Sequence, residues 1–141
     1  MMWRLRLPSA SRIRGRLAHG SVLLVPVRVQ GQDFEFLVDT GAAYTALSPE
    51  IVTLLGLIVV PSRTITIVPA YGALVQVPVI TIAELRIGGL QVLHVEAMVL
   101  QFPQPLKLDG LLGMNVLKQF RMTIEVDTQT LVLRPLGRSF P

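Results

Sequence analysis

Cysteine is absent from the 141 residues, so neither disulfides nor thiolate metal sites can form within them. Histidine occurs only at His19 and His94, too far apart in sequence to indicate a metal cluster, so we expect no metal and no cofactor. The longest apolar stretch, Leu54 to Val60, is far shorter than the roughly 18 residues that span a bilayer, and no transmembrane segment is expected. Aromatic residues make up only 6%, too few for an obvious base-stacking platform, so no nucleic-acid partner is expected.

The positive charge of the chain is concentrated near its amino terminus. Residues 1–16 contain five arginines and no acid, whereas residues 17–141 contain 8 basic and 9 acidic residues, so +5 and −1 make up the net +4. The arginine-rich part has no apolar core of the kind that a secretory signal needs, so a cytoplasmic location is the default expectation. We expect a basic, flexible leader over 1–20, a folded domain over 21–136 and a tail over 137–141. Such a leader could contact anionic lipid or nucleic acid, although solvation is the commoner state.

Beyond the leader, short runs of alternating apolar and polar residues predict an all-β domain with one or two short helices. Ser48 followed by Pro49 is a typical helix start, so a helix is expected over 49–55, and a second over 114–120. The pair Gly88-Gly89 predicts a tight hairpin turn. Strands are expected at residues 21–30, 33–38, 43–47, 64–68, 75–82, 85–87, 90–99, 111–112, 121–126 and 130–134.

The tetrapeptide Asp39-Thr40-Gly41-Ala42 follows the apolar run Phe34 to Val38, a pattern that predicts a carboxylate on a tight turn at a strand end. This motif occurs once. The nearest imitation, Val126-Asp127-Thr128-Gln129, lacks the glycine and is predicted to be an ordinary hairpin turn. Two carboxylates that share one proton can activate water for peptide hydrolysis, so a chain with one copy must obtain the second from another protomer.

Three blocks, Phe36 to Ala42, Thr45 to Glu50 and Asp109 to Met114, resemble the retropepsin-like aspartic protease family. These are single-domain relatives of pepsin that work as homodimers, and the resemblance covers roughly residues 21 to 135. It implies a closed β-barrel or sandwich with a flap hairpin and short helices. The chain is too short for the two-lobed pepsin architecture, which carries both active-site loops on one polypeptide.

The resemblance also implies a role for each candidate residue. Asp39 would carry the acid and base chemistry, and Thr40 would hydrogen-bond across the dimer axis. Gly41 would adopt backbone angles closed to other residues and admit a close approach, while Ala42 is the small residue common there. The flap would contain Ala70, Tyr71 and Gly72, with Tyr71 in reach of substrate, and the loop would be supported by Leu111, Leu112 and Gly113, the glycine allowing close backbone passage.

The function implied is an aspartic endopeptidase in which water, activated between the Asp39 carboxylates of a homodimer, attacks a peptide or protein substrate. A different interpretation is a catalytically inactive dimerisation or peptide-binding module with the same fold. Taken singly, each motif also has a plain structural interpretation: an Asx turn, an exposed hairpin tip and an apolar connection between strand and helix.

Overall fold

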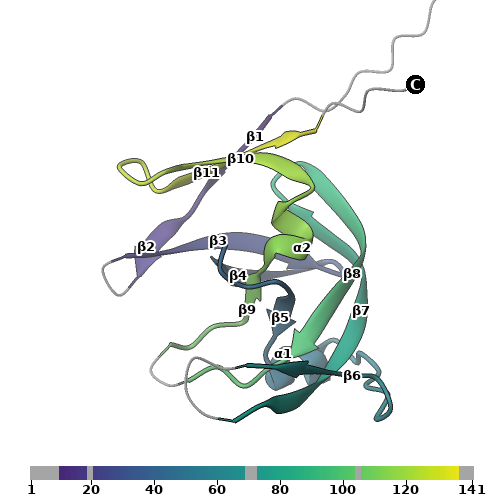
Figure 1. The fold of residues 1–141 in the computed structure, drawn as a ribbon. Coiled ribbons are helices and arrows are strands. Elements are labelled where there is room, and N and C mark those ends of the chain that lie inside the picture. The colour runs from purple at the N-terminus through teal and green to yellow at the C-terminus, as the bar shows by residue number, and fades with distance from the viewer. Residues whose placement is uncertain (1–9, 19–20, 69–72, 104–105, 137–141) are drawn as a thin grey trace, which may run out of the picture.

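The computed structural model describes residues 10–18, 21–68, 73–103 and 106–136, and these form a mostly β domain with two short helices (Figure 1). The predicted all-β class is therefore confirmed. The strands are β1 Ser11–Arg14, β2 Arg16–Ala18, β3 Val22–Val29, β4 Gln32–Val38, β5 Thr45–Leu47, β6 Thr64–Ile67, β7 Val75–Ile87, β8 Leu90–Val99, β9 Gly110–Leu112, β10 Phe120–Glu125 and β11 Thr130–Pro135; the helices are α1 Pro49–Leu54 and α2 Met114–Leu117.

Eight strands form one sheet in the order β2-β3-β4-β9-β5-β8-β7-β6, and a further pairing between β3 and β7 closes most of it into a barrel. The closing pairs are Arg28 with Arg86 and Val29 with Leu85. Closure leaves few strand edges free and encloses a core in which Phe36 and Val29 are fully buried. Two of the pairings, β4 with β9 and β5 with β8, are parallel, which brings segments distant in sequence together.

A separate sheet of three strands, in the order β1-β11-β10, lies at one end of the barrel, at the top of Figure 1. Its inner face contributes Ile13, Leu131 and Leu133 to the core. Residues 11–18 were expected to belong to a flexible leader, but the structure places the strands β1 and β2 there. The physical reason is pairing with partners elsewhere in the chain, since Ser11 lies opposite Leu133 in β11.

The two helices are shorter than the sequence indicated. Ser48 caps α1 as predicted, because its side chain accepts a hydrogen bond from the Ile51 amide and Pro49 occupies the first turn. Helix α2 ends at Leu117 instead of Phe120, because Phe120 pairs with Pro135 and already belongs to β10. The hairpin at Gly88-Gly89 is confirmed, between β7 and β8. No helix in the described part of the chain is long and apolar enough to cross a membrane.

Candidate active site

Asp39 is the first residue after β4, and its position is fixed through the main chain. The last residue of β4, Val38, pairs with Leu112 in the parallel strand β9. The Asp39 amide then donates to the Leu112 carbonyl at 3.0 Å. The Asp39 carboxylate accepts from the Gly41 amide at 2.9 Å, which closes an Asx turn around the acid. Because the side chain is only partly buried, a reacting molecule can reach it.

The other three residues of the motif complete this turn. The Ala42 amide donates to the Asp39 carbonyl at 3.3 Å, while Thr40 and Gly41 are exposed. Gly41, which admits backbone angles closed to other residues, does not have a positive φ here. A Cβ atom added at Gly41 would meet only the Asp39 carboxylate, at 3.3 Å. The glycine therefore keeps space beside the acid, and its left-handed freedom is not used.

The end of the third sequence block, with the residue after it, holds the far side of the same loop. The Met114 amide donates to the Ala42 carbonyl at 2.7 Å, and the Asn115 amide donates to the Ala43 carbonyl at 3.0 Å. The chain passes so closely at Gly113 that an added Cβ atom would lie 2.3 Å from the Tyr44 carbonyl oxygen. The first turn of α2 is thus bonded directly to the loop that carries the acid.

Asn115 connects the loop to the rest of the barrel, and the sequence reasoning missed it. Its Oδ1 accepts from the Thr45 amide at 2.8 Å and from the Thr45 hydroxyl at 2.9 Å. Its Nδ2 donates to the Glu96 carbonyl in β8 at 2.7 Å, and the Thr45 hydroxyl in turn accepts from the Gly113 amide at 3.1 Å. The available signal was an amide side chain one residue into a short helix that directly follows a buried apolar strand.

Leu111, Leu112 and Gly110 make up β9, which lies between β4 and β5 and is buried. Gly110 is required by space, because an added Cβ atom would lie 2.7 Å from the Ala46 carbonyl oxygen and 2.6 Å from the Phe36 ring. These contacts explain why two glycines bracket the leucines of this block. At each end of β9 the main chain lies against the main chain of another segment, and a side chain would not fit between them.

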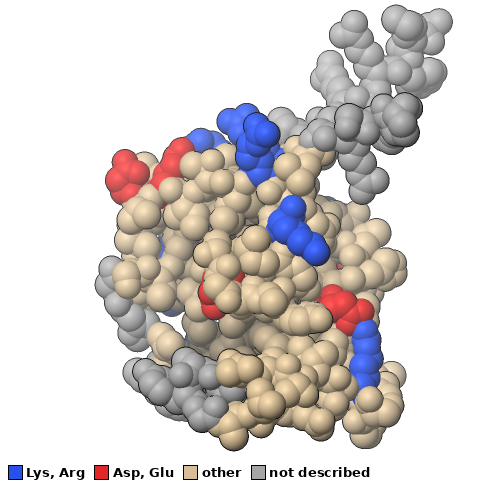
Figure 2. Space-filling model, viewed as in Figure 1, with Lys and Arg blue, Asp and Glu red and all other residues tan. Residues whose placement is uncertain are grey.

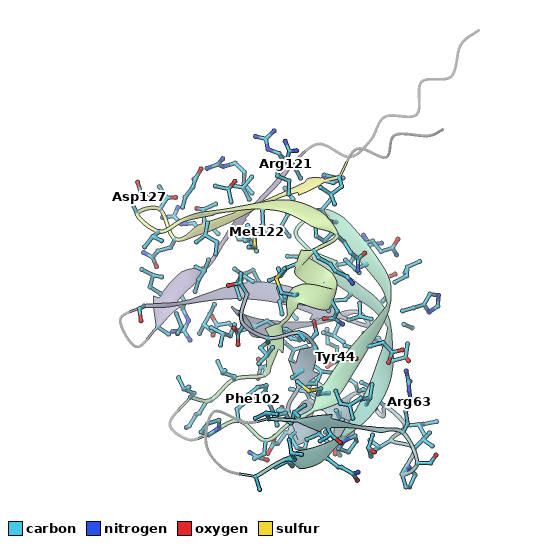
Figure 3. All side chains as sticks on the ribbon, viewed as in Figure 1. Tyr44, Arg63, Phe102, Arg121, Met122 and Asp127 are labelled. Atoms are coloured by element: carbon cyan, nitrogen blue, oxygen red, sulfur yellow. The ribbon has the colours of Figure 1, made fainter. Side chains whose placement is uncertain are left out.

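An apolar groove of about 440 Å³ adjoins the Asp39 loop. One wall is the loop itself, from Gly41 to Tyr44, and the other is β6 with the residue after it. Figure 3 labels Tyr44 on this side of the barrel, near the β6–β7 hairpin. No charged side chain lines the groove among the residues that the structure describes: Gly41, Ala42, Ala43, Tyr44, Ile65, Thr66, Ile67, Val68 and Met98. The predicted flap residues Ala70, Tyr71 and Gly72 lie outside the described residues, between β6 and β7.

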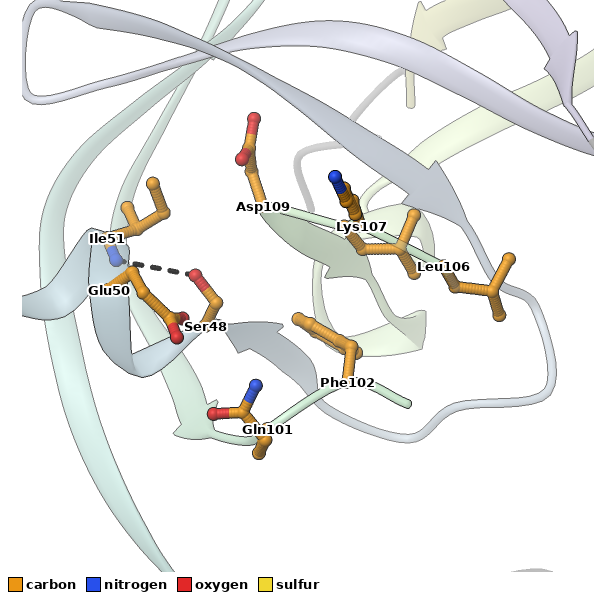
Figure 4. A pocket seen from close by; sticks show the side chains of 9 residues that line it. Ser48, Glu50, Ile51, Gln101, Phe102, Leu106, Lys107 and Asp109 are labelled. Carbon is orange, nitrogen blue, oxygen red and sulfur yellow. Dashed lines mark hydrogen bonds between the residues drawn. The ribbon is translucent and has the colours of Figure 1, made fainter. Parts of the chain in front are cut away.

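A second hollow of about 200 Å³ lies next to α1, and Asp109 is one of its walls (Figure 4). The Asp109 carboxylate accepts from the Glu35 amide at 3.0 Å, and its carbonyl accepts from the Ser48 amide at 2.9 Å. These bonds join β4, β9 and α1. Asp109 is therefore engaged in holding the barrel together, and it does not line the groove beside Asp39.

An ion pair joins β2 to β4, the strand that leads into the Asp39 loop. Arg16 donates to both carboxylate oxygens of Glu35, at 2.7 and 2.6 Å. The hydrogen bond from Arg16 lowers the pKa of Glu35, partial burial opposes that shift, and the positive charge of Arg16 adds to it. Within the described ranges, no group of three or more histidine, aspartate or glutamate side chains could hold a metal ion.

Comparison with known proteins gives one family and two informative structures. A family model described as gag-polyprotein putative aspartyl protease matches residues 25–119. The crystal structure of a retropepsin-like aspartic protease from Rickettsia conorii has 25% identity and a TM-score of 0.65, covering 88% of this chain and 89% of that one. The retroviral protease-like domain of Ddi1 from Leishmania major has 17% identity and a TM-score of 0.53, covering 82% and 94%, a likeness of fold alone. No curated protein matches the chain.

Proposed function

We propose, from the premise that this chain belongs to the family of gag-polyprotein putative aspartyl proteases and has the retropepsin-like fold, that it is an aspartic endopeptidase acting as a homodimer. The family match spans both the Asp39 loop and the block around Gly113. The observation that carries the proposal is the clamped loop: a reachable carboxylate, fixed by main-chain bonds on both sides, next to an apolar groove.

The second carboxylate of the proposed pair would come from another copy of the chain. Within one copy, the acid of the third sequence block, Asp109, is bonded to the Glu35 amide and lines a different hollow. A twofold axis through the Asp39 loops would bring two identical carboxylates together, with Thr40 beside them. Two acids so close cannot both ionise cheaply, so the pair would share one proton.

Exposed apolar residues next to the loop support such a contact between copies. Tyr44 lies in the loop itself, and Met114 follows Gly113; their exposed fractions are 37% and 36%. Strand β10 packs against α2, carries Ile124 with an exposed fraction of 39%, and pairs with β11 alone among the described strands. A free edge with apolar side chains suits pairing with an identical strand.

In the proposed reaction, water lies between the two Asp39 carboxyl groups. The ionised one accepts a proton from the water as it attacks the substrate carbonyl, and the protonated one donates to the carbonyl oxygen. The amide nitrogen is protonated when the tetrahedral intermediate collapses, so no covalent acyl-enzyme forms. Because only the singly protonated pair is competent, hydrolysis should fall at both low and high pH. The groove between Tyr44 and β6 would hold apolar side chains of an extended peptide.

The test is Asp39→Asn, measured by cleavage of a peptide library together with molecular mass in solution. The substitution keeps the size of the side chain and removes the acid, so we expect hydrolysis to fall by at least about 10²–10⁴-fold while the dimer persists. Asp127→Asn is the matched control, because it removes an exposed acid from a hairpin turn. Hydrolysis retained by Asp39→Asn would defeat the proposal. A wild-type chain that binds peptide across a broad pH range and never cuts it would indicate the binding module instead.

A further inference from the structure

A third hollow, of about 520 Å³, is lined by residues of β1, β3, β4 and β7, and its volume is typical of small-molecule sites. Its charged residues are Arg12 and Arg14 of β1, Arg28 of β3, Arg86 of β7 and Asp33 of β4. Four arginines and one aspartate give the described lining a formal charge of +3. Charged residues make up only 16% of the sequence, and most of the face shown in Figure 2 carries none, so four arginines around one hollow are a local concentration.

The walls of the hollow are held in place by close packing at both ends of β1. At one end, the Gly89 amide donates to the Ser11 hydroxyl at 3.2 Å, and a Cβ atom added at Gly88 would collide with that hydroxyl oxygen. At the other end, a Cβ atom added at Gly15 would collide with the Leu24 carbonyl oxygen of β3. Strand β1 therefore has little room to shift. A hollow that is already formed binds a ligand at a lower cost in conformational entropy.

Two of the arginines lie opposite each other where the barrel closes. Arg28 and Arg86 are directly paired in the antiparallel register of β3 with β7. Like charges in opposed positions destabilise a sheet. Asp33 offsets part of this repulsion by accepting from Arg28 at 2.9 and 3.2 Å. Glu84 does the same for Arg86 at 3.0 Å. An anion bound between the two guanidinium groups would offset what remains.

The ion pairs leave most guanidinium donors free to bind a ligand. A guanidinium group has five N–H donors. Arg28 uses two nitrogens for its acidic partner, whereas Arg12 and Arg86 each use one. Arg14 forms no ion pair with a described residue, although all nine acidic side chains of the sequence are described. The acids thus restrain three guanidinium groups without using up their donors.

This arrangement favours a ligand with several anionic groups close together. Arginine binds phosphate and carboxylate groups through paired N–H donors. A phosphate group carries more negative charge and more acceptor oxygens than a carboxylate, so linked phosphates suit four arginines that share one hollow. The described lining includes no aromatic side chain and so offers no surface on which a nucleobase could stack.

We propose that this hollow binds a small molecule with two or more linked phosphate groups. The site is distinct from the groove beside Asp39, because Asp33 lines it near the start of β4, and Asp39 follows the end of that strand, about 20 Å farther along an extended chain. The proposal therefore stands whether or not the protein hydrolyses peptides. Since the ligand bridges β1 to the strands that close the barrel, its binding stabilises the folded chain.

The test is calorimetric titration of the full chain with inorganic triphosphate, with sulfate and citrate as comparison probes at the same ionic strength. Wild type should bind triphosphate more tightly than either probe and less tightly as salt is raised, and triphosphate should raise its unfolding temperature. Arg14→Gln should weaken binding about fivefold, as expected for one charge pair at an exposed site. Arg121→Gln is the matched control, because Arg121 is also exposed and has no ion pair with a described residue, but does not line the hollow. It should change binding less than about twofold.

A second pair of variants keeps the net charge constant. Arg28→Gln with Asp33→Asn removes one guanidinium group from the hollow together with its acid. Binding should weaken about fivefold, because directed donors are lost although the charge is unchanged. Arg63→Gln with Glu96→Gln removes an ion pair that does not line the hollow, and it should leave binding unchanged.

Three results would overturn the proposal. Equal loss of binding in Arg14→Gln and Arg121→Gln would mean that overall charge decides binding. Citrate bound as tightly as triphosphate would mean that the hollow does not select phosphate. The absence of both heat and stabilisation at millimolar triphosphate would mean that no such site exists.

Discussion

Two turns of this molecule begin with the same dipeptide, and only one is built as a site. Asp39-Thr40-Gly41 follows β4, and Asp127-Thr128-Gln129 follows β10. In the first, the Asp39 amide donates to the Leu112 carbonyl at the start of the loop, and the Met114 and Asn115 amides donate to carbonyls at its end. In the second, the Gln129 amide donates to the Val126 carbonyl at 3.2 Å, and the distant Gly15 and Leu17 amides donate to Gln129 and not to Asp127. The two turns thus differ in where they are held: the first is bonded at the acidic residue itself, and the second at the glutamine two residues after its acid.

The two acids, Asp39 and Asp127, also differ in burial and in what lies beside them. Asp39 is partly buried and borders an apolar groove, whereas Asp127 is exposed at the tip of a hairpin. Glycine at the third position of the first turn keeps space beside its carboxylate. Gln129 at the corresponding place in the second has a φ of 53° and turns the chain back. The comparison predicts that substitutions in the residues that hold the Asp39 loop reduce stability and hydrolysis far more than substitutions in the turn at Asp127.

The largest effect is expected from Gly113→Ala, which disrupts the close approach between Gly113 and the loop that carries Asp39. Its Cβ atom would lie 2.3 Å from the Tyr44 carbonyl oxygen, and main chain cannot move aside as a flexible side chain can. Overpacking typically costs about 1–3 kcal/mol, and we expect a loss at the upper end of that range from the free energy of unfolding because the obstacle is main chain. Equilibrium unfolding in urea measures this free energy for the variant and for wild type. Gly89→Ala is the control, since nothing lies within 4 Å of its Cβ position; equal stability of the two variants would contradict the clamp.

A smaller effect is expected from Asn115→Ala, which removes the side chain that joins Thr45 to the Glu96 carbonyl. The buried Thr45 amide and hydroxyl lose their acceptor, which costs about 1–3 kcal/mol. If the proposed hydrolysis exists, kcat should fall about tenfold with little change in KM, because the loop loses its positioning while the groove remains. Gln119→Ala, which removes an exposed amide just after α2, should leave the free energy of unfolding and kcat unchanged. A kcat equal to wild type would show that Asn115 supports stability alone.

The sequence predicted the elements that depend on local chemistry. The Ser48 cap, the Gly88-Gly89 hairpin and the turn at Asp39 each follow from residues adjacent in the chain. It did not predict β1, because an arginine-rich strand gains its order from pairing with β11, more than 100 residues later. It also missed Asn115, because nothing near that residue in sequence reveals that Thr45 is its partner. The family membership that these local motifs suggested is confirmed, whereas the roles of the site residues stay proposals.

A third substitution tests whether the Asp-Thr-Gly sequence alone is sufficient for hydrolysis. Gln129→Gly, placed in an Asp39→Asn background, creates a second Asp-Thr-Gly sequence at the β10–β11 turn. Glycine tolerates the positive φ there, while the bond from the Leu17 amide to Gln129 Oε1 is lost, so stability should change by about 1 kcal/mol at most. Hydrolysis should stay absent in a peptide cleavage assay. Any recovered cleavage would contradict the comparison, because a turn whose acidic residue is not itself bonded to a distant segment would then suffice.

The smallest effect concerns the acids on the strands that lead into the two turns, Glu35 paired with Arg16 and Glu125 paired with Arg12. The pKa of Glu35 is lowered in the folded chain by the hydrogen bond from Arg16, so its ionised form stabilises folding above the ordinary glutamate pKa. That stabilisation is lost as pH falls through the lowered pKa. Glu35→Gln should therefore be slightly less stable than wild type at neutral pH and equal to it in acid, and high salt should shrink the difference because both side chains are solvent-exposed. Urea unfolding across pH measures this difference. A difference that persisted in acid would mean that packing of the Glu35 stem against β4, and not its charge, supports the strand that ends at Asp39.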